Sequence, residues 1–155
     1  MKFLEAFIDD YKYYDPKKVE IKNILKKINL KNKTILDIGA GIGRLSLALS
    51  KYAKRIVALD KDKRFKKYFQ KRKKKNVIFV NKKAEDYLKD DKKFDVIILA
   101  WPTLNFKFID LIKKVMHKKS KLVFITCDDD SDFETIIDRL DIINKKYFSR
   151  DVKNK

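Results

Sequence analysis

The sequence predicts one α/β domain with a doubly wound, mostly parallel sheet. Two observations support this prediction. All three glycines of the 155-residue chain, Gly39, Gly41 and Gly43, fall within five residues, between an apolar run and an amphipathic segment. Five more short apolar runs follow, and segments with helical spacing of apolar residues lie between most of them. Such alternation is typical of folds in which helices cover both faces of a parallel sheet.

Two helices are expected before the glycine cluster. Apolar residues repeat at helical spacing in residues 4–11 and again in residues 21–28. Asp15 and Pro16 separate the two segments, and proline is favoured at the first position of a helix. We therefore expect residues 1–30 to be a helical N-terminal cover, 31–148 the α/β core and 149–155 a tail.

The glycine cluster marks a turn between a strand and a helix. Ile35, Leu36 and Ile38 lead into it, and the amphipathic segment from Leu45 to Tyr52 leads out of it. Glycine adopts positive φ readily and allows the backbone to approach a ligand, because it has no Cβ. A strand, a glycine loop and a helix in this order open a nucleotide-binding α/β unit, with the ligand above the carboxyl end of the strand.

The remaining strands are expected in five apolar runs, at Arg55–Asp60, Val77–Val80, Phe94–Ala100, Lys121–Cys127 and Asp141–Phe148. Three helices are expected between them, with inward faces formed by Phe65, Tyr68 and Phe69, by Phe108, Ile112, Val115 and Met116, and by Phe133, Ile136, Ile137 and Leu140. Together with the strand before the glycines this makes six strands, for which we expect the order 3-2-1-4-5-6.

The spacing of the glycines and one acid indicate the kind of ligand. The pattern is G-x-G-x-G rather than the G-x-G-x-x-G of dinucleotide binding. Asp37 stands two residues before the first glycine. A carboxylate at that position would repel a pyrophosphate and would attract a cationic ligand. S-adenosylmethionine fits this description, since it carries a sulfonium and an ammonium group and no phosphate.

Leu36–Gly43 resembles the first motif of the class I S-adenosylmethionine-dependent methyltransferases, which have a Rossmann-like fold. Asp60 follows about 20 residues after the first glycine, the spacing expected for a carboxylate that binds ribose hydroxyls. Asn81–Asp86 resembles the third motif of the family, whose acid binds the adenine amino group. The resemblance covers residues 34–127 and implies a set of cofactor-binding residues: Asp37, Gly39, Ala40, Gly41, Gly43, Asp60, Lys61, Glu85, Asp86, Ala100 and Trp101.

Ala100 and Trp101 bear on the methyl acceptor. Enzymes of this family that methylate base amino groups have Asn or Asp after the fourth strand, then two prolines and an aromatic residue. Ala100 stands at the position of the Asn or Asp and Trp101 at that of the proline, so the resemblance does not support methylation of a base amino group. Trp101 either stacks on a planar acceptor or packs over the cofactor pocket.

Cys127 is a second candidate, because cytosine-5 RNA methyltransferases have a nucleophilic cysteine in a similar Thr-Cys after the fifth strand. The three acids that follow it disfavour a thiolate, and the partner motif of those enzymes is missing. A small buried residue is the favoured interpretation of Cys127. Neither Trp101 nor Cys127 is assigned a catalytic role, and the catalytic residues are not identified from the sequence.

The charge of the chain has two interpretations. The chain has 40 Lys and Arg against 22 Asp and Glu, a net charge of +18. Such a surface favours nucleic acid or acidic partners. Most of these cations are lysines, however, and abundant Lys, Ile and Asn also fit a compositional bias. The run Lys71–Lys75 either contacts phosphates or caps the C-terminus of a helix.

Composition excludes several classes of protein. No apolar run is long enough for a membrane span, and the first residues lack the apolar core of a signal peptide. One cysteine allows no internal disulfide, which fits a cytoplasmic protein, and one histidine leaves no histidine–cysteine metal site. We therefore expect a cytoplasmic protein without a metal or a membrane partner; its oligomeric state is not predicted.

The leading hypothesis is an S-adenosylmethionine-dependent methyltransferase that acts on a macromolecule, either RNA or a protein lysine. No inserted substrate domain is evident, so the expected platform is open, and the layout resembles the small archaeal protein lysine methyltransferases. Two alternatives remain at this point. One is a small-molecule methyltransferase with the N-terminal helices as its lid, and the other is a nonenzymatic subunit that binds the cofactor or a nucleic acid.

Overall fold

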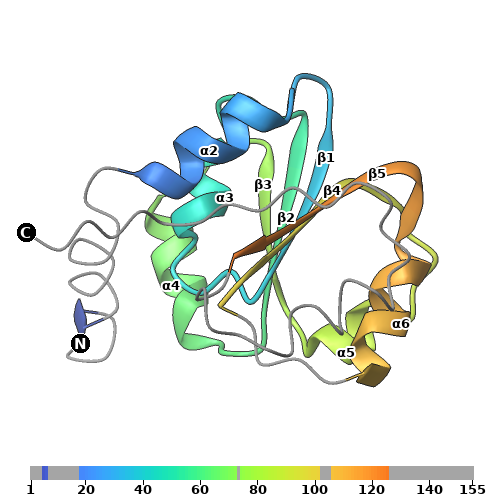
Figure 1. The fold of residues 1–155 in the computed structure, drawn as a ribbon. Helices are drawn as coiled ribbons and strands as arrows, with labels where there is room; N and C mark the ends of the chain where they lie inside the picture. The colour runs from blue at the N-terminus through green and yellow to red at the C-terminus, as the bar shows by residue number, and fades with distance from the viewer. Residues whose placement is uncertain (1–4, 7–17, 73, 102–105, 126–155) are drawn as a thin grey trace, which may run out of the picture.

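The computed structural model describes residues 5–6, 18–72, 74–101 and 106–125, and it shows an α/β sandwich (Figure 1). The described part contains five strands: β1 (Thr34–Ile38), β2 (Arg55–Asp60), β3 (Val77–Asn81), β4 (Phe94–Ala100) and β5 (Met116–Ile125). All neighbouring strands pair in parallel, in the order β3-β2-β1-β4-β5. The predicted doubly wound parallel sheet is confirmed for these strands, and the sixth strand expected at 141–148 lies outside the described residues.

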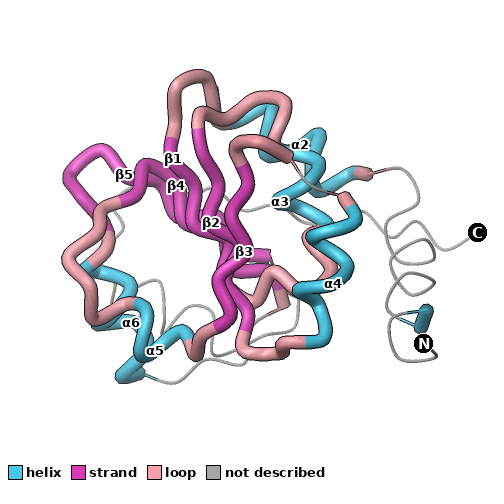
Figure 2. The backbone as a smooth tube through the Cα atoms, turned by 180° about the vertical axis from the view of Figure 1, so that it is seen from behind, coloured by secondary structure: helices cyan, strands magenta, loops and turns pink. Residues whose placement is uncertain are grey.

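Helices cover both faces of this sheet. Helices α2 (Val19–Lys27), α3 (Arg44–Leu49) and α4 (Arg64–Lys71) lie on one face, and α5 (Ala84–Tyr87) and α6 (Phe106–Lys114) lie on the other, as both views show (Figures 1 and 2). Helix α2 confirms the second of the two predicted N-terminal helices. The first predicted helix lies almost entirely outside the described residues. Only Glu5 and Ala6 are described in that region, and both are helical.

Alternation along each strand produces two apolar cores. In β1, Leu36 and Ile38 pack in the cluster that contains α5 and α6, while Ile35 packs with α2 and α3. In β4, residues 96 and 98 face one cluster and residues 97 and 99 the other. Because both faces are buried, these strands are almost continuously apolar, as central strands of a parallel sheet require.

The end of α6 differs from the prediction. The spacing predicted a helix that includes Met116 and a strand that begins at Lys121, whereas α6 ends at Lys114 and β5 begins at Met116. Met116 pairs with Phe94 and Lys121 with Val96, so two steps along β4 correspond to five along β5. The hydroxyl of Ser120 fills this bulge, since it donates to the carbonyl of Phe94 and accepts from the backbone N–H of His117.

A largely buried ion pair joins α2 to the beginning of α3. The carboxylate of Glu20 pairs with the guanidinium of Arg44, and their side chains are only 13% and 16% exposed. Arg44 is the first residue of α3 and follows Gly43 directly. The N-terminal helix α2 therefore contacts the structure immediately after the glycine loop.

All three glycines of the loop have positive φ, but their surroundings differ. A Cβ on Gly39 or Gly41 would meet no atom within 4 Å, whereas a Cβ on Gly43 would lie 2.4 Å from Cζ of Phe69. The Phe69 ring belongs to α4 and is 6% exposed, so it has little room to move. Gly43 is therefore required for packing between α3 and α4, and the other two leave open space next to the backbone.

We expect Gly43→Ala to lower the free energy of unfolding by about 2–5 kcal/mol. About 1–2 kcal/mol comes from the left-handed backbone and about 1–3 kcal/mol from the contact with Phe69. Gly41→Ala is the matched control, since it has the same backbone cost and no clash, and should lose only about 1–2 kcal/mol. Urea unfolding of both variants measures the difference, and equal losses would contradict the packing role of Gly43.

Candidate functional site

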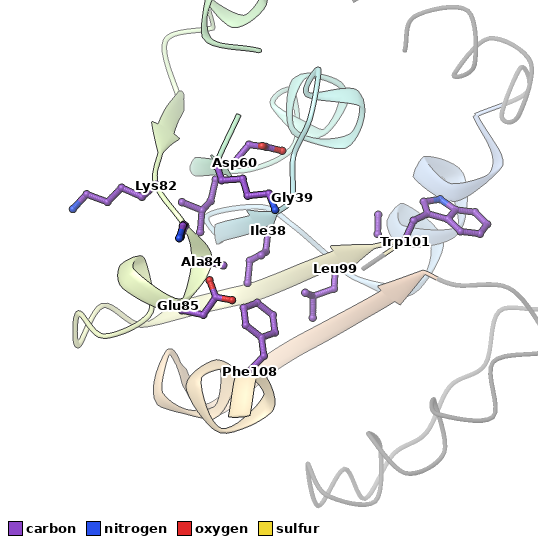
Figure 3. A pocket seen from close by; sticks show the side chains of 13 residues that line it. Ile38, Gly39, Asp60, Lys82, Ala84, Glu85, Leu99, Trp101 and Phe108 are labelled. Atoms are coloured by element: carbon purple, nitrogen blue, oxygen red, sulfur yellow. The ribbon is translucent and has the colours of Figure 1, made fainter. Parts of the chain in front are cut away.

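A cavity of about 420 Å³ lies above the carboxyl ends of β1, β2 and β4 (Figure 3). It is lined by the last large apolar residues of these strands, Ile38, Leu59 and Leu99, and by Gly39. Phe108 of α6 and Ala84 of α5 also line it. Ligands of open α/β sheets bind at this edge, so the cavity lies where the sequence placed the ligand.

Six of the predicted cofactor-binding residues line the cavity: Gly39, Asp60, Lys61, Glu85, Ala100 and Trp101. Seven lining residues were not predicted: Ile38, Leu59, Lys82, Lys83, Ala84, Leu99 and Phe108. The three strand-end residues among them follow from the rule that ligands bind at the carboxyl ends of strands. The position of Phe108 had no signal in the sequence, because it depends on how α6 packs against the sheet.

The carboxylate of Asp60 connects two turns at the edge of the cavity. Its Oδ2 accepts a hydrogen bond from the backbone N–H of Gly41 at 2.8 Å, and its Oδ1 accepts from the N–H of Asp62 at 2.8 Å. Each carboxylate oxygen has a second lone pair. Asp60 can therefore hold the glycine loop and still accept hydrogen bonds from two hydroxyl groups of a ligand.

Asp37 is in the core and does not line the cavity. Its side chain is 2% exposed, and its Oδ2 accepts hydrogen bonds from the hydroxyl of Ser46 at 2.5 Å and from the backbone N–H of Ser46 at 3.2 Å. Burial raises the pKa of Asp37 to about 6; the hydrogen bonds from Ser46 lower it, and the carboxylate of Asp60 raises it. In this structure Asp37 connects β1 to α3, rather than facing a cationic ligand.

The other predicted residues are near the cavity without lining it. Ala40 packs with Ala58 and Phe69 in a small apolar cluster, and Gly41 and Gly43 shape the loop. Asp86 is exposed and accepts a hydrogen bond from Nζ of Lys89 at 3.0 Å, which holds the pKa of Asp86 below its usual value. Glu85, next to it in α5, is the acid that lines the cavity.

Trp101 lies at the end of β4 in an unusual backbone conformation. Its φ is +55°, and its backbone N–H donates to the carbonyl of Ile125 in β5 at 2.8 Å. The side chain is 49% exposed and lines the cavity. Cys127, the other candidate for catalysis, lies outside the described residues.

The basic run Lys71–Lys75 is only partly described, because Lys73 lies outside the described residues. Lys71 is the last residue of α4, and the guanidinium of Arg72 stacks on the ring of Tyr68 at 3.9 Å from its centroid. This geometry agrees with cations at a helix C-terminus.

The described residues offer no metal site and no membrane helix. They contain no group of three His, Cys, Asp or Glu side chains that could hold an ion. Within the same ranges, no helix is long and apolar enough to cross a bilayer.

Comparison with known proteins agrees with this geometry. Residues 10–125 match the sequence profile of the ribosomal RNA adenine dimethylase family. The chain belongs to this family. The dimethylase family comprises S-adenosylmethionine-dependent methyltransferases, as the first motif predicted.

Two curated relatives and one solved structure illustrate the similarity. The chain is 34% identical over 110 residues to an uncharacterized RNA methyltransferase of Mycoplasma mobile, covering 65% of this chain and 29% of that protein. It is 33% identical over 104 residues to a ribosomal protein L11 methyltransferase of Thermotoga maritima, covering 64% and 39%. A tRNA methyltransferase from M. jannaschii superposes with a TM-score of 0.54 at 28% identity, covering 66% and 33%. The chain thus spans well under half the length of these relatives.

The cavity fits the cofactor of the dimethylase family. It offers open space beside Gly39, lone pairs on Asp60 and a second acid in Glu85. Ala100 also lines the cavity. It stands where enzymes that methylate base amino groups have Asn or Asp, and its side chain has no hydrogen-bonding group.

Asp37 should make stability depend on pH. Its folded pKa of about 6 exceeds the ordinary 3.8, so the folded protein holds more protons between about pH 4 and 6, and stability falls as the pH rises through this window. The loss contributed by Asp37 is on the order of 3 kcal/mol. Asp37→Asn should remove it, and urea unfolding from pH 4 to 7 measures the difference between the two profiles. Profiles that run parallel would contradict the burial of an ionisable Asp37; Asp86→Asn, at an exposed acid, is the control.

Asp60→Ala should weaken S-adenosylmethionine binding at least tenfold. Hydrogen bonds to a charged group contribute about 1.5–3 kcal/mol each, and the variant also releases the N–H of Gly41. Asp62→Ala is the matched control, because its carboxylate contacts Arg64 and not the cavity. Isothermal titration calorimetry measures both, and an unchanged affinity for Asp60→Ala would remove Asp60 from the site.

Proposed function

We propose that the protein is an S-adenosylmethionine-dependent methyltransferase whose acceptor is RNA. The observation that carries this proposal is the cavity above β1, β2 and β4, in which a glycine with open space beside it and two acids meet at the carboxyl edge of the sheet. The match of residues 10–125 to the dimethylase family supports the same conclusion.

Each part of the cofactor has a counterpart in the cavity. The backbone at Gly39 leaves room for a close approach of the cofactor. Asp60 would accept hydrogen bonds from the ribose hydroxyls, and Glu85 would accept one from the adenine amino group. When bound, the cofactor supplies an electrophilic methyl group on sulfur, so the residues of the chain mainly position the two reactants. Ala100 and Trp101 would then border the acceptor.

RNA is favoured as the acceptor by charge and by relatives. Lys61, Lys82 and Lys83 line the cavity alongside Asp60 and Glu85, and the whole chain carries a net charge of +18. Lysines at the mouth of a site attract phosphates. The family and the Mycoplasma mobile relative are both named for RNA methylation. Ala100 provides no side-chain acceptor for an exocyclic amino group, so we do not extend the proposal to adenine N6.

A ribosomal protein is the second candidate acceptor. The Thermotoga maritima relative that matches 64% of this chain is named a ribosomal protein L11 methyltransferase. The open edge of the cavity would also admit a side chain presented by a protein.

Methyl transfer from labelled S-adenosylmethionine tests the proposal. The protein is incubated with ribosomal RNA, with ribosomal proteins and with small metabolites in three separate reactions. We expect label to be incorporated in the reaction with ribosomal RNA. The cofactor at about 100 times its dissociation constant should stabilise the fold by about 2.7 kcal/mol, or roughly 5–10 °C. NAD should not. Label in the protein fraction alone would favour the second candidate, and no stabilisation by the cofactor would overturn the enzyme assignment.

A further inference from the structure

We propose that the outer side of α4 binds the sugar–phosphate backbone of the acceptor RNA and leads it to the cavity. The surface consists of three lysines, Lys63, Lys67 and Lys71, here called the α4 lysine row. The inference rests on the proposed function and adds the path by which the acceptor approaches. Three observations carry it: the geometry of the row, its cost to the helix, and the distribution of charge between the two faces of the sheet.

The row lies on the side of α4 that faces away from the sheet. Helix α4 buries Phe65 and Phe69, and Phe69 packs with residues of β2 and β3. Lys67 and Lys71 follow these two phenylalanines by two residues, which is about 200° around a helix. Lys63 directly precedes α4 with helical φ and ψ and continues the same line. All three lysines are exposed.

The spacing of the row suits a strand of RNA. Residues four apart lie on one side of a helix and about 6 Å from each other along its axis, so the three lysines span about 12 Å. Consecutive phosphates of a single strand can therefore each meet one lysine. Lys61, two residues before the row begins, lines the cavity together with Lys82 and Lys83. The cations of the row thus continue those of the cavity along the α4 side of the sheet (Figures 1 and 2).

The stability of α4 does not account for the row. Cations are unfavourable at a helix N-terminus, yet Lys63 and Arg64 stand there and the first turn has no acid. Like charges four residues apart repel each other, and the row contains two such pairs. Only Lys71, at the C-terminus, is favoured by the helix dipole.

No carboxylate in the described part of the chain pairs with a lysine of the row. Asp62 is the acid nearest to the row in the sequence, and its Oδ1 accepts a hydrogen bond from Nε of Arg64 at 2.9 Å. The charge of Asp62 is therefore already matched by Arg64. A partner with negative charge would relieve the repulsion within the row.

The distribution of charge argues against compositional bias alone. Two segments of 12 residues, 61–72 with α4 and 84–95 with α5, each contain eight charged residues. In 61–72 seven of these are cations and one is an acid, whereas in 84–95 three are cations and five are acids. Helices α4 and α5 lie on opposite faces of the sheet (Figures 1 and 2). A bias towards lysine along the whole chain would not separate the two faces in this way.

RNA fits the row better than an acidic protein does. The backbone of a nucleic acid presents one negative charge per nucleotide at regular intervals, which matches a row of evenly spaced cations. Acidic side chains on the surface of a folded protein have no such regular spacing. An acidic peptide is the competing occupant.

Binding of a short single-stranded RNA to the full chain tests the inference. The row variant carries Lys63→Gln, Lys67→Gln and Lys71→Gln. Loss of three surface charge contacts should weaken RNA binding roughly 3- to 140-fold. The log–log slope of affinity against salt should become shallower by about 2, at about 0.7 per phosphate on a single strand. Fluorescence anisotropy of a labelled RNA measures both quantities.

A control variant removes the same charge at another place. Lys31→Gln, Lys51→Gln and Lys54→Gln change three exposed lysines in the turns before β1 and β2, at the opposite edge of the sheet from the cavity. This variant should keep the affinity and the salt slope of the wild type. Equal losses in the two variants would show that only the net charge matters, and this would overturn the inference while the proposed function stands.

Stability and turnover separate RNA binding from a structural role. Gln has about the same helix propensity as Lys, and the row variant loses like-charge repulsion, so it should melt at or above the wild-type temperature. It should keep its affinity for S-adenosylmethionine, because no residue of the row lines the cavity. In methyl transfer to ribosomal RNA, KM should rise and kcat should stay unchanged. A row variant that melts lower and loses cofactor affinity together with RNA affinity would show a structural role and contradict the inference.

A poly-glutamate peptide distinguishes the class of partner. It should compete with the RNA only weakly. If the peptide binds the wild type as tightly as the RNA does, and loses as much affinity in the row variant, the surface serves an acidic protein and the inference fails. If the wild type binds RNA through the row but transfers methyl groups only to protein, the RNA acceptor of the proposed function fails, and with it the path inferred for that acceptor.

Discussion

The hydrogen bond from the backbone N–H of Gly41 to the carboxylate of Asp60 is the contact on which the candidate site depends. It connects the turn after β1 to the turn after β2, and the second oxygen of the same carboxylate holds the N–H of Asp62. The backbone of Gly39 and Ala40 adds two hydrogen bonds to the carbonyl of Leu59. The floor of the cavity is therefore fixed by the parallel register of β1 and β2, before any ligand binds.

Two polar contacts, one buried and one largely buried, hold α3, the helix after the glycine loop. Asp37 in β1 accepts hydrogen bonds from Ser46 of α3, and Arg44 at the start of α3 pairs with Glu20 of α2. Ionisable groups are rarely buried without partners, because burial costs the charged form its hydration. Here the partners lie in neighbouring elements, so these groups determine how α2 and α3 sit against the glycine loop.

The two ends of the cavity differ in chemistry. The end at β2 and α5 has acids and lysines, which suits the polar groups of a nucleoside, whereas the end at β4 has Ala100 and an exposed indole. The chain thus belongs to the dimethylase family, yet its acceptor end lacks the polar side chain associated with base amino groups. The exposed indole of Trp101, on a backbone with positive φ, stands at that end instead.

The sequence by itself determined the strands, their order as far as β5 and the edge at which the cavity lies, because these depend on local periodicity and on glycines with positive φ. It also singled out Gly39 and Asp60, whose positions follow from motif spacing. Tertiary structure decided which neighbour in a motif faces the cavity. Glu85 lines the cavity, whereas Asp86 accepts a hydrogen bond from Lys89. Asp37 is buried and accepts a hydrogen bond from Ser46, and Phe108 of α6 lines the cavity. The physical reason is that spacing specifies where a residue stands along the chain, whereas side-chain direction and burial depend on elements that pack from distant parts of it.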